Sequence, residues 1–477
     1  MKAFILLSYF FISVSQAEAH AFGSRYDLPL PLELYVSAAA IAVAFSFIIL
    51  CIFLRPQNSF KKAPYSDLLA LSYLKWLESD VFLNLIKFLS IAFFIFLLST
   101  AYLGSANPLN NFASIFVWVV WWVGLAFISA LLGNFWALIN PWANLFSFFN
   151  FLRKKKSHIL IYPQFLGFWP NVIFLVIFAW MELISGQAEQ PKFLVTLILI
   201  YSGVTWAGMF LFGQRKWLVN GEVFHATFGI LSKFAPTQIV DGKWKICVPS
   251  TALLINRPAT IPEVIFVLVL LSTVTFDGIL ETPLWLNILS FISENLVLRP
   301  ILIWLDAVGI DLIILIKTIA LIIVPFSFFV VFSGFCLLIS EFGSARKIPT
   351  KDILGYFVYS LVPIAIAYHL SHYLSYLVIA GQYLIPLLSD PYNLGWDLFG
   401  TQNYKVDIGI INAKLIWYVA VFSIVIGHIF AVYIAHVMAF RVFHDRKSAI
   451  QSQYPMMVLM IGYTMLSLWI LSQPIVE

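Results

Sequence analysis

Charged residues are scarce in this sequence. Asp, Glu, Lys and Arg make up 11% of its 477 residues, whereas soluble domains carry roughly 25%. Hydrophobic residues make up 61%, and no stretch is long and polar enough to form a separate soluble domain. The scarcity of charge therefore excludes an ordinary soluble protein and predicts one membrane domain whose main partner is the lipid bilayer.

Short motifs of several enzyme classes are absent as well. The sequence has no Walker A loop, no GxSxG, no HExxH and no CxxCH, so ATP hydrolysis, serine-hydrolase chemistry and covalent haem have no support. The three cysteines have no CxxC spacing and imply no disulfide framework. Whether the protein is an enzyme stays open at this stage.

The N-terminal segment 1–19 predicts a cleavable signal peptide. It has one lysine, a short apolar run and an A-x-A cleavage site, and the run is too short to span a membrane. His20 would then be the first residue of the mature protein. We expect residues 20–477 to form a single transmembrane domain.

Ten apolar segments follow, each with the length of a transmembrane helix of about 20 residues or more. They lie at 32–54, 81–103, 113–133, 166–186, 193–213, 262–280, 308–340, 353–379, 414–440 and 455–473. We therefore expect an all-α fold, a polytopic helix bundle with about ten transmembrane helices.

Lys and Arg are divided unevenly between the connections of these segments. Twenty of them lie in alternate linkers, near 55–80, 143–165, 214–261, 341–352 and 441–454. Five lie on the opposite side, namely Arg25, Lys192, Arg299, Lys405 and Lys414. Because positive charge marks the cytoplasmic side, the protein should be N-out and C-out in a bacterial inner (cytoplasmic) membrane. The net charge of +5 then reflects topology and indicates no nucleic-acid partner.

One of the basic linkers contains an amphipathic helical pattern. Segment 220–235 places five apolar side chains largely on one side of a helix, and Asn220 is a suitable N-cap. This pattern predicts a helix that lies on the cytoplasmic membrane surface.

Four ionisable residues fall within or at the ends of predicted spans, where a central charge costs at least ~2.5–3.5 kcal/mol. They are Glu182, Asp277, Glu281 and Lys317. Asp277 and Glu281 are spaced i, i+4 with helix-breaking residues between and after them, which suggests a broken helix end that lines a cavity. Either the four form a proton or cation relay, or Asp277 or Glu182 makes an ion pair with Lys317.

Three histidines also fall within predicted spans. His369 and His372 are spaced i, i+3 and share one helix face, and His428 on the next span is the nearest third ligand by depth. His20 would add an imidazole and an α-amine, a chelate that favours copper. The expected cofactor is copper, with zinc or iron as alternatives. In the other interpretation, the histidines only form hydrogen bonds with nearby Tyr, Ser or carboxylate groups.

Five segments resemble a family of bacterial multipass membrane proteins whose members are sometimes labelled fenitrothion hydrolase. They are HAFGSRYDLPLPL (20–32), GNFWALINPW (133–142), FDGILETPLW (276–285), AYHLSHYL (367–374) and SDPYNLGWDLFGT (389–401). The resemblance runs over most of the chain and implies a membrane-bound organophosphate hydrolase, but it gives no residue a role. A looser similarity to copper-handling membrane proteins rests on residue types and topology.

Three functions stay open. The favoured one is binding or moving a metal ion, most plausibly copper, at a periplasm-facing histidine and carboxylate site. The second is a proton- or cation-coupled secondary transporter of a small molecule. The third is a metal-dependent hydrolase of apolar esters, in which the same histidines hold the metal and Glu182 or Asp277 is the general base. Because the buried polar groups fall in the outer half of the membrane, we expect the site to open toward the periplasm.

Overall fold

The computed structural model describes most of the chain. The described ranges are 31–53, 65–67, 72–153, 159–240, 243–343, 348–443 and 445–473. The signal peptide and His20 lie outside the described residues, so both stay predictions.

Helices dominate the described residues, as expected for an all-α membrane protein. Nine of the described helices are long and apolar enough to cross a membrane. They are α2 (Leu32–Phe53), α3 (Asp80–Leu103), α4–η5–α5 (Phe112–Leu131), α9 (Pro191–Phe212), α12 (Ile261–Leu280), α15 (Leu312–Phe342), α16–η8–α17–η9–α18 (Thr350–Ser389), α19 (Ala413–Val442) and α20–α21 (Arg446–Ser472). The remaining predicted segment, 166–186, is the shorter helix α8 (Trp169–Leu183). Each of the ten predicted segments therefore coincides with a helix, and the all-α fold is confirmed.

Local sequence explains where several of these helices begin. Thr260 and Glu263 form a capping box at the start of α12, and Pro262 occupies the first turn. The side chains of Asp311 and Asn412 accept backbone N–H groups at the starts of α15 and α19. The caps satisfy donors that a helix start would otherwise leave unpaired.

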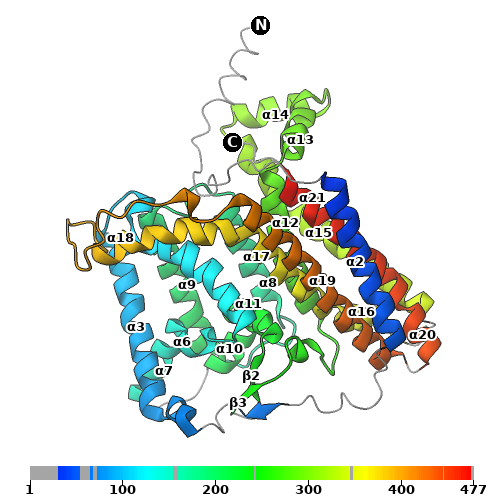
Figure 1. Ribbon diagram of the computed structural model, residues 1–477. Coiled ribbons are helices and arrows are strands. Elements are labelled where there is room, and N and C mark those ends of the chain that lie inside the picture. The colour runs from blue at the N-terminus through cyan, green and yellow to red at the C-terminus, as the bar shows by residue number, and fades with distance from the viewer. Residues whose placement is uncertain are drawn as a thin grey trace.

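Two short helices follow α12 in a region where the sequence predicts no span. They are α13 (Pro283–Glu294) and α14 (Leu298–Ala307), and they are bent by 91° relative to each other. Figure 1 shows both at the upper edge of the bundle, beyond the end of α12.

A small antiparallel sheet joins two of the basic linkers. Strands β1 (Ser66–Asp67), β2 (Thr237–Val240) and β3 (Lys243–Ile246) pair in the order β1-β3-β2. In register, Ile246 lies opposite both Ser66 and Thr237. The linkers 55–80 and 214–261 therefore meet at one end of the molecule, at the bottom of Figure 1. This pairing requires both on the same side of a membrane, while the N-out, C-out orientation itself stays a prediction.

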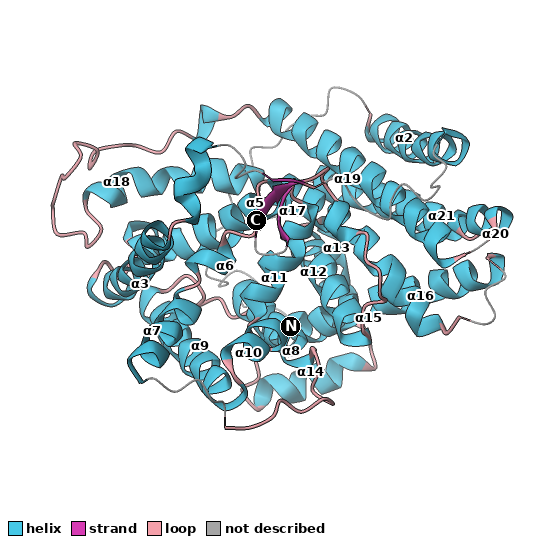
Figure 2. Ribbon diagram, turned by 90° about the horizontal axis from the view of Figure 1, so that it is seen from below, coloured by secondary structure: helices cyan, strands magenta, loops and turns pink. Residues whose placement is uncertain are grey.

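The spans differ in how deeply they lie in the bundle. The buried share is 83% for the α16–α18 span, 72% for α12 and 67% for the α4–α5 span, against 11% for α3 and 17% for α2. Figure 2, which looks along the bundle, shows α5, α12 and α17 (Val362–Ala380) near the middle and α2 and α3 at the rim. Two of the central spans, α12 and α17, carry the predicted site residues Asp277, His369 and His372.

The predicted surface helix at 220–235 is wrong. Helix α11 (Val223–Leu231) follows α10 (Gln214–Asn220) and packs against α5 and α8, with seven of its nine residues buried. Its N-cap is Glu222, not Asn220. Ala226, Thr227 and Ile230 complete an almost uniformly apolar surface, and a helix that is apolar all round is buried in the protein.

Candidate functional site

Asp277 connects two of the central spans. It lies in the last turn of α12 and is 5% exposed. Its Oδ2 accepts a hydrogen bond from the Tyr373 hydroxyl at 2.7 Å and shares a proton with Nε2 of His372 at 2.9 Å. His372 and Tyr373 are neighbours on α17. The carboxylate therefore bridges α12 and α17 through two short hydrogen bonds, one of them to a group that can change its own protonation state.

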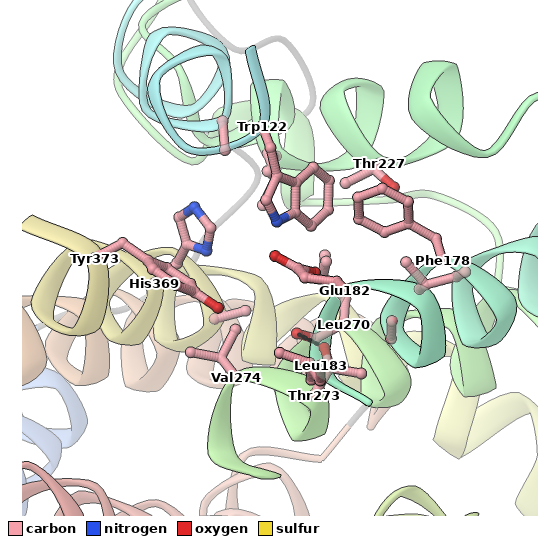
Figure 3. A pocket seen from close by; sticks show the side chains of 15 residues that line it. Trp122, Phe178, Glu182, Leu183, Thr227, Leu270, Thr273, Val274, His369 and Tyr373 are labelled. Atoms are coloured by element: carbon pink, nitrogen blue, oxygen red, sulfur yellow. Dashed lines mark hydrogen bonds between the residues drawn. The ribbon is translucent and has the colours of Figure 1, made fainter. Parts of the chain in front are cut away.

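Glu182 faces a small cavity beside this bridge. The cavity has a volume of about 30 Å³ and lies between α8, α12, α17, α11 and the third span, α4–η5–α5. Figure 3 shows that Glu182, His369 and Trp122 point into the same space, with Tyr373 beside it. At about 10–15 Å³ per molecule, the cavity has room for about two waters.

One buried nitrogen atom at this cavity, Nε2 of His369, has no hydrogen-bond partner in the described part of the chain. The indole N–H of Trp122 beside it points toward the carboxylate of Glu182 and interacts with it (Figure 3). Buried polar atoms are rarely left unpaired, and those without a protein partner are commonly satisfied by water. Since both groups line the cavity, its wall is polar on the side of Glu182 and His369.

A π-helix places Trp122 at the cavity. The segment η5 (Phe116–Gly124) lies between α4 (Phe112–Ile115) and α5 (Leu125–Leu131) in the third span. His369 interacts with the backbone of Val123 within this segment. π-Helical segments inside α-helices are often found at functional sites. The local irregularity of the third span therefore coincides with the polar centre of the bundle.

The other two members of the predicted relay lie farther from the cavity. Glu281 is the C-cap of α12, one turn beyond Asp277, and its charge acts on His372 and Tyr373. Lys317 is partly buried on α15, where the charges of Asp277 and Asp311 act on it. The hydrogen bonds described above join Asp277 to α17, so Asp277 is not held by an ion pair with Lys317 alone.

The three membrane histidines occupy three different environments. His369 lines the cavity, and His372 binds Asp277. His428 is fully buried on α19, donates from Nδ1 to the Ile424 carbonyl at 2.8 Å, and does not line the cavity. Among the described residues, no group of three or more His, Cys, Asp or Glu is arranged to hold a metal ion. His428 thus does not complete a site with the pair, and the copper, zinc or iron cofactor stays a prediction.

The described residues include two buried carboxylates that the sequence analysis did not single out, Glu222 and Asp390. Glu222 is fully buried and accepts hydrogen bonds from the Tyr201 hydroxyl at 2.6 Å and from Asn140 Nδ2 at 3.0 Å. It also accepts from Trp136 Nε1 and from the backbone N–H groups of Phe224 and His225 in the first turn of α11. Its sequence signal is an acidic residue directly before an apolar run, where a helix N-terminus favours negative charge.

A larger hollow lies elsewhere in the bundle. It has a volume of about 300 Å³ and is lined by side chains such as Phe93, Trp121 and Trp142, from α3, η5 and α7 (Pro141–Arg153). Its lining is almost entirely apolar, so it offers little for acid–base or ligand chemistry. The small cavity beside Asp277 is the stronger candidate for the functional site.

Fold and site together define a multispanning α-helical membrane protein with a cluster of buried ionisable groups at its centre. The chain matches no protein-family model, no curated protein and no solved structure at a significant level. The argument about function therefore rests on the residues of this chain.

Proposed function

We propose that the protein is a proton-coupled secondary transporter and that Asp277, together with Glu182, binds the coupling proton. The observation that carries the proposal is the hydrogen-bonded group of Asp277, His372 and Tyr373 between α12 and α17, beside a cavity that contains Glu182. Ionisable groups buried in membrane proteins commonly form proton relays.

Protonation of Asp277 would change the contact between α12 and α17. As an anion, the carboxylate accepts hydrogen bonds from both His372 and Tyr373. Once Oδ2 carries a proton, it becomes a donor, so His372 must turn its Nε2 into an acceptor or move away. Proton binding is thereby linked to the packing of two central spans, which is what coupling between a proton and a conformational change requires.

The cavity supplies a route between the two carboxylates. Glu182 and His369 both face a space with room for about two waters, and Tyr373 lines it while donating to Asp277. A proton that arrives at Glu182 reaches the Asp277 group through these waters and the imidazole of His369. The two histidines change protonation near neutral pH in water, which suits them to such transfer.

A metal cation as the transported substrate is a second proposal. It is favoured by the unpaired Nε2 of His369, which lies in the same cavity as the carboxylate of Glu182. Imidazole and carboxylate are ligands for copper, zinc and iron. A hydrolase activity stays an expectation of the family resemblance alone.

Membrane vesicles test the proposal. Inverted and right-side-out vesicles would be energised, and a fluorescent pH probe would record proton movement after addition of copper, zinc, sodium, potassium, organic cations or small organic acids. We expect at least one of these to release protons through the wild-type protein and to lose about tenfold or more of that rate in Asp277→Asn. Asp306→Asn, at an exposed site on α14, is the matched control and should behave as wild type. Equal responses of wild type and Asp277→Asn to the whole panel would contradict the proposal.

A further inference from the structure

A second group of buried polar side chains lies around Tyr463 on α21 (Gln453–Ser472). The Tyr463 hydroxyl forms a hydrogen bond of 2.6 Å with Oγ1 of Thr275 on α12. Thr275 has a single hydroxyl hydrogen, and it donates to the Leu271 carbonyl at 3.2 Å. Tyr463 is therefore the donor toward Thr275, and the lone pairs of its own oxygen remain available as acceptors.

Two buried polar atoms near Tyr463 have no hydrogen-bond partner among the described residues. They are the hydroxyl of Tyr368 and Nε2 of His428. The His428 ring lies 6.1 Å from that of Tyr463, and the Ser467 hydroxyl, one turn farther along α21, interacts with the Tyr463 hydroxyl. Tyr368 lies within electrostatic range of Tyr463. A cluster of unpaired polar atoms in an otherwise apolar interior costs free energy, and water molecules are the common way in which such atoms are satisfied.

Tyr368 links this cluster to the Asp277 site. It lies one turn before His372 on α17, and the two rings are 6.4 Å apart. Its hydroxyl lies beside Gly278, since a Cβ at that glycine would be 3.0 Å from the Tyr368 oxygen. Gly278 follows Asp277 directly, so the lack of a side chain there leaves room for the Tyr368 hydroxyl next to the proton-binding group.

The cluster extends from Asp277 into the bundle, away from the end of α12 that carries Glu281. Thr275 precedes Asp277 by two residues, which is about 3 Å along the helix. On the other side of the cluster, Gly427, the neighbour of His428, packs against Ala367 and Pro363 of α17. The polar groups therefore continue from the Asp277 site toward the middle of the bundle.

We propose that Tyr368, Tyr463 and His428 extend the proton pathway from Asp277 toward the middle of the bundle. The inference rests on the proposed proton-coupled function and extends it to three residues outside the cavity. Each tyrosine hydroxyl accepts one proton on its oxygen and releases its own, so it is neutral before and after the transfer. His428 takes up and releases a proton at Nε2, because its Nδ1 proton is donated to the Ile424 carbonyl.

Potential-driven proton flux in proteoliposomes tests this pathway. The full-length protein would be reconstituted around a trapped pH-sensitive dye, and a potassium diffusion potential would drive protons inward. We expect Tyr463→Phe and Tyr368→Phe each to lower the flux about tenfold or more, because phenylalanine keeps the ring and removes only the hydroxyl. Tyr454→Phe, at an exposed tyrosine on the same helix as Tyr463, should leave the flux unchanged. The wild-type flux should also be slower in D2O, which a purely structural role of the hydroxyls would not produce.

The possible results separate the two proposals. If wild type conducts, Asp277→Asn does not, and Tyr463→Phe and Tyr368→Phe both conduct as wild type does, the pathway inference is overturned while Asp277 keeps its role. If wild type conducts no more than protein-free liposomes, the pathway is also overturned, and the vesicle experiment with Asp277→Asn then decides whether proton coupling fails with it. Size-exclusion chromatography of each variant before reconstitution shows that a lost flux is not a lost fold.

Discussion

At the scale of single residues, the hydrogen-bonded buried carboxylates Glu222 and Asp277 differ in their partners. Glu222 accepts only from groups that keep their protons near neutral pH, namely tyrosine, asparagine, indole and backbone N–H donors. Asp277 accepts from a histidine and a tyrosine. A histidine partner can itself take up or lose a proton near neutral pH, whereas the partners of Glu222 do not. We therefore propose a structural role for Glu222 and a functional role for Asp277.

This difference predicts opposite effects of two conservative substitutions. Glu222→Gln replaces one accepting oxygen by an NH2 group that faces the donors on that oxygen, either Asn140 or Tyr201 among them, so it should lower the stability by roughly 3 kcal/mol. Asp277→Asn should reduce transport far more than stability. The midpoint of thermal unfolding in detergent measures the first effect, with the exposed Glu294→Gln as control. A Glu222→Gln protein as stable as the control would show that the five hydrogen bonds do not hold the α11 region in place.

At the scale of helices, the central contact between α17 and α19 depends on a small residue. Gly427 on α19 faces α17 so closely that an added Cβ would lie 2.5 Å from the Ala367 Cβ and 2.7 Å from the Pro363 carbonyl oxygen. Small residues at such crossings let transmembrane helices approach and gain van der Waals contact. The same approach positions His428, the next residue, against the cluster around Tyr463.

A single added methyl group at this crossing should therefore separate the two helices. We expect Gly427→Ala to cost about 1–3 kcal/mol of stability through overpacking. Gly462→Ala on α21 is the matched control, because nothing lies within 4 Å of a Cβ there, and it should be neutral or slightly stabilising. Thermal unfolding of the two variants side by side measures the difference. Equal midpoints would mean that α17 and α19 can shift apart at no cost.

At the scale of the whole molecule, the sequence predicts the number and limits of the spans better than their arrangement. Apolar length is a local property, so the segments 81–103 and 262–280 match α3 and α12 within one residue at each end. The same reasoning fails for α11, because a helix side of apolar residues can face a membrane surface or a protein interior, and only the packing against α5 and α8 decides between them. The bent pair of α13 and α14 is missed because neither helix has the length of a span.

The site shows the same limit. Charges within apolar segments are visible in the sequence, so Glu182, Asp277, His369 and His372 could all be selected as candidates. Their pairing depends on the rotation of each helix about its axis, which depth along a span does not define. His428 lies at a suitable depth for a third ligand, yet its ring faces Tyr463. Glu222 is missed because it precedes a short buried helix and lies in no span.

Orientation in the membrane is the remaining property of the whole molecule, and it decides from which side the site is reached. Glu281 and α13 lie at the end of α12 opposite the sheet, and the positive-inside rule assigns the sheet to the cytoplasm.

Lys243 in β3 and Lys405 in the loop before α19 are both exposed lysines on opposite predicted sides, so they form a matched pair. A membrane-impermeant maleimide should label Lys405→Cys in intact cells and label Lys243→Cys only after the membrane is opened. Wild type supplies the baseline, because its cysteines are buried or half-buried. The reverse pattern would place Glu281 on the cytoplasmic side, and the Asp277 site would then be reached from the cytoplasm instead of from the periplasm.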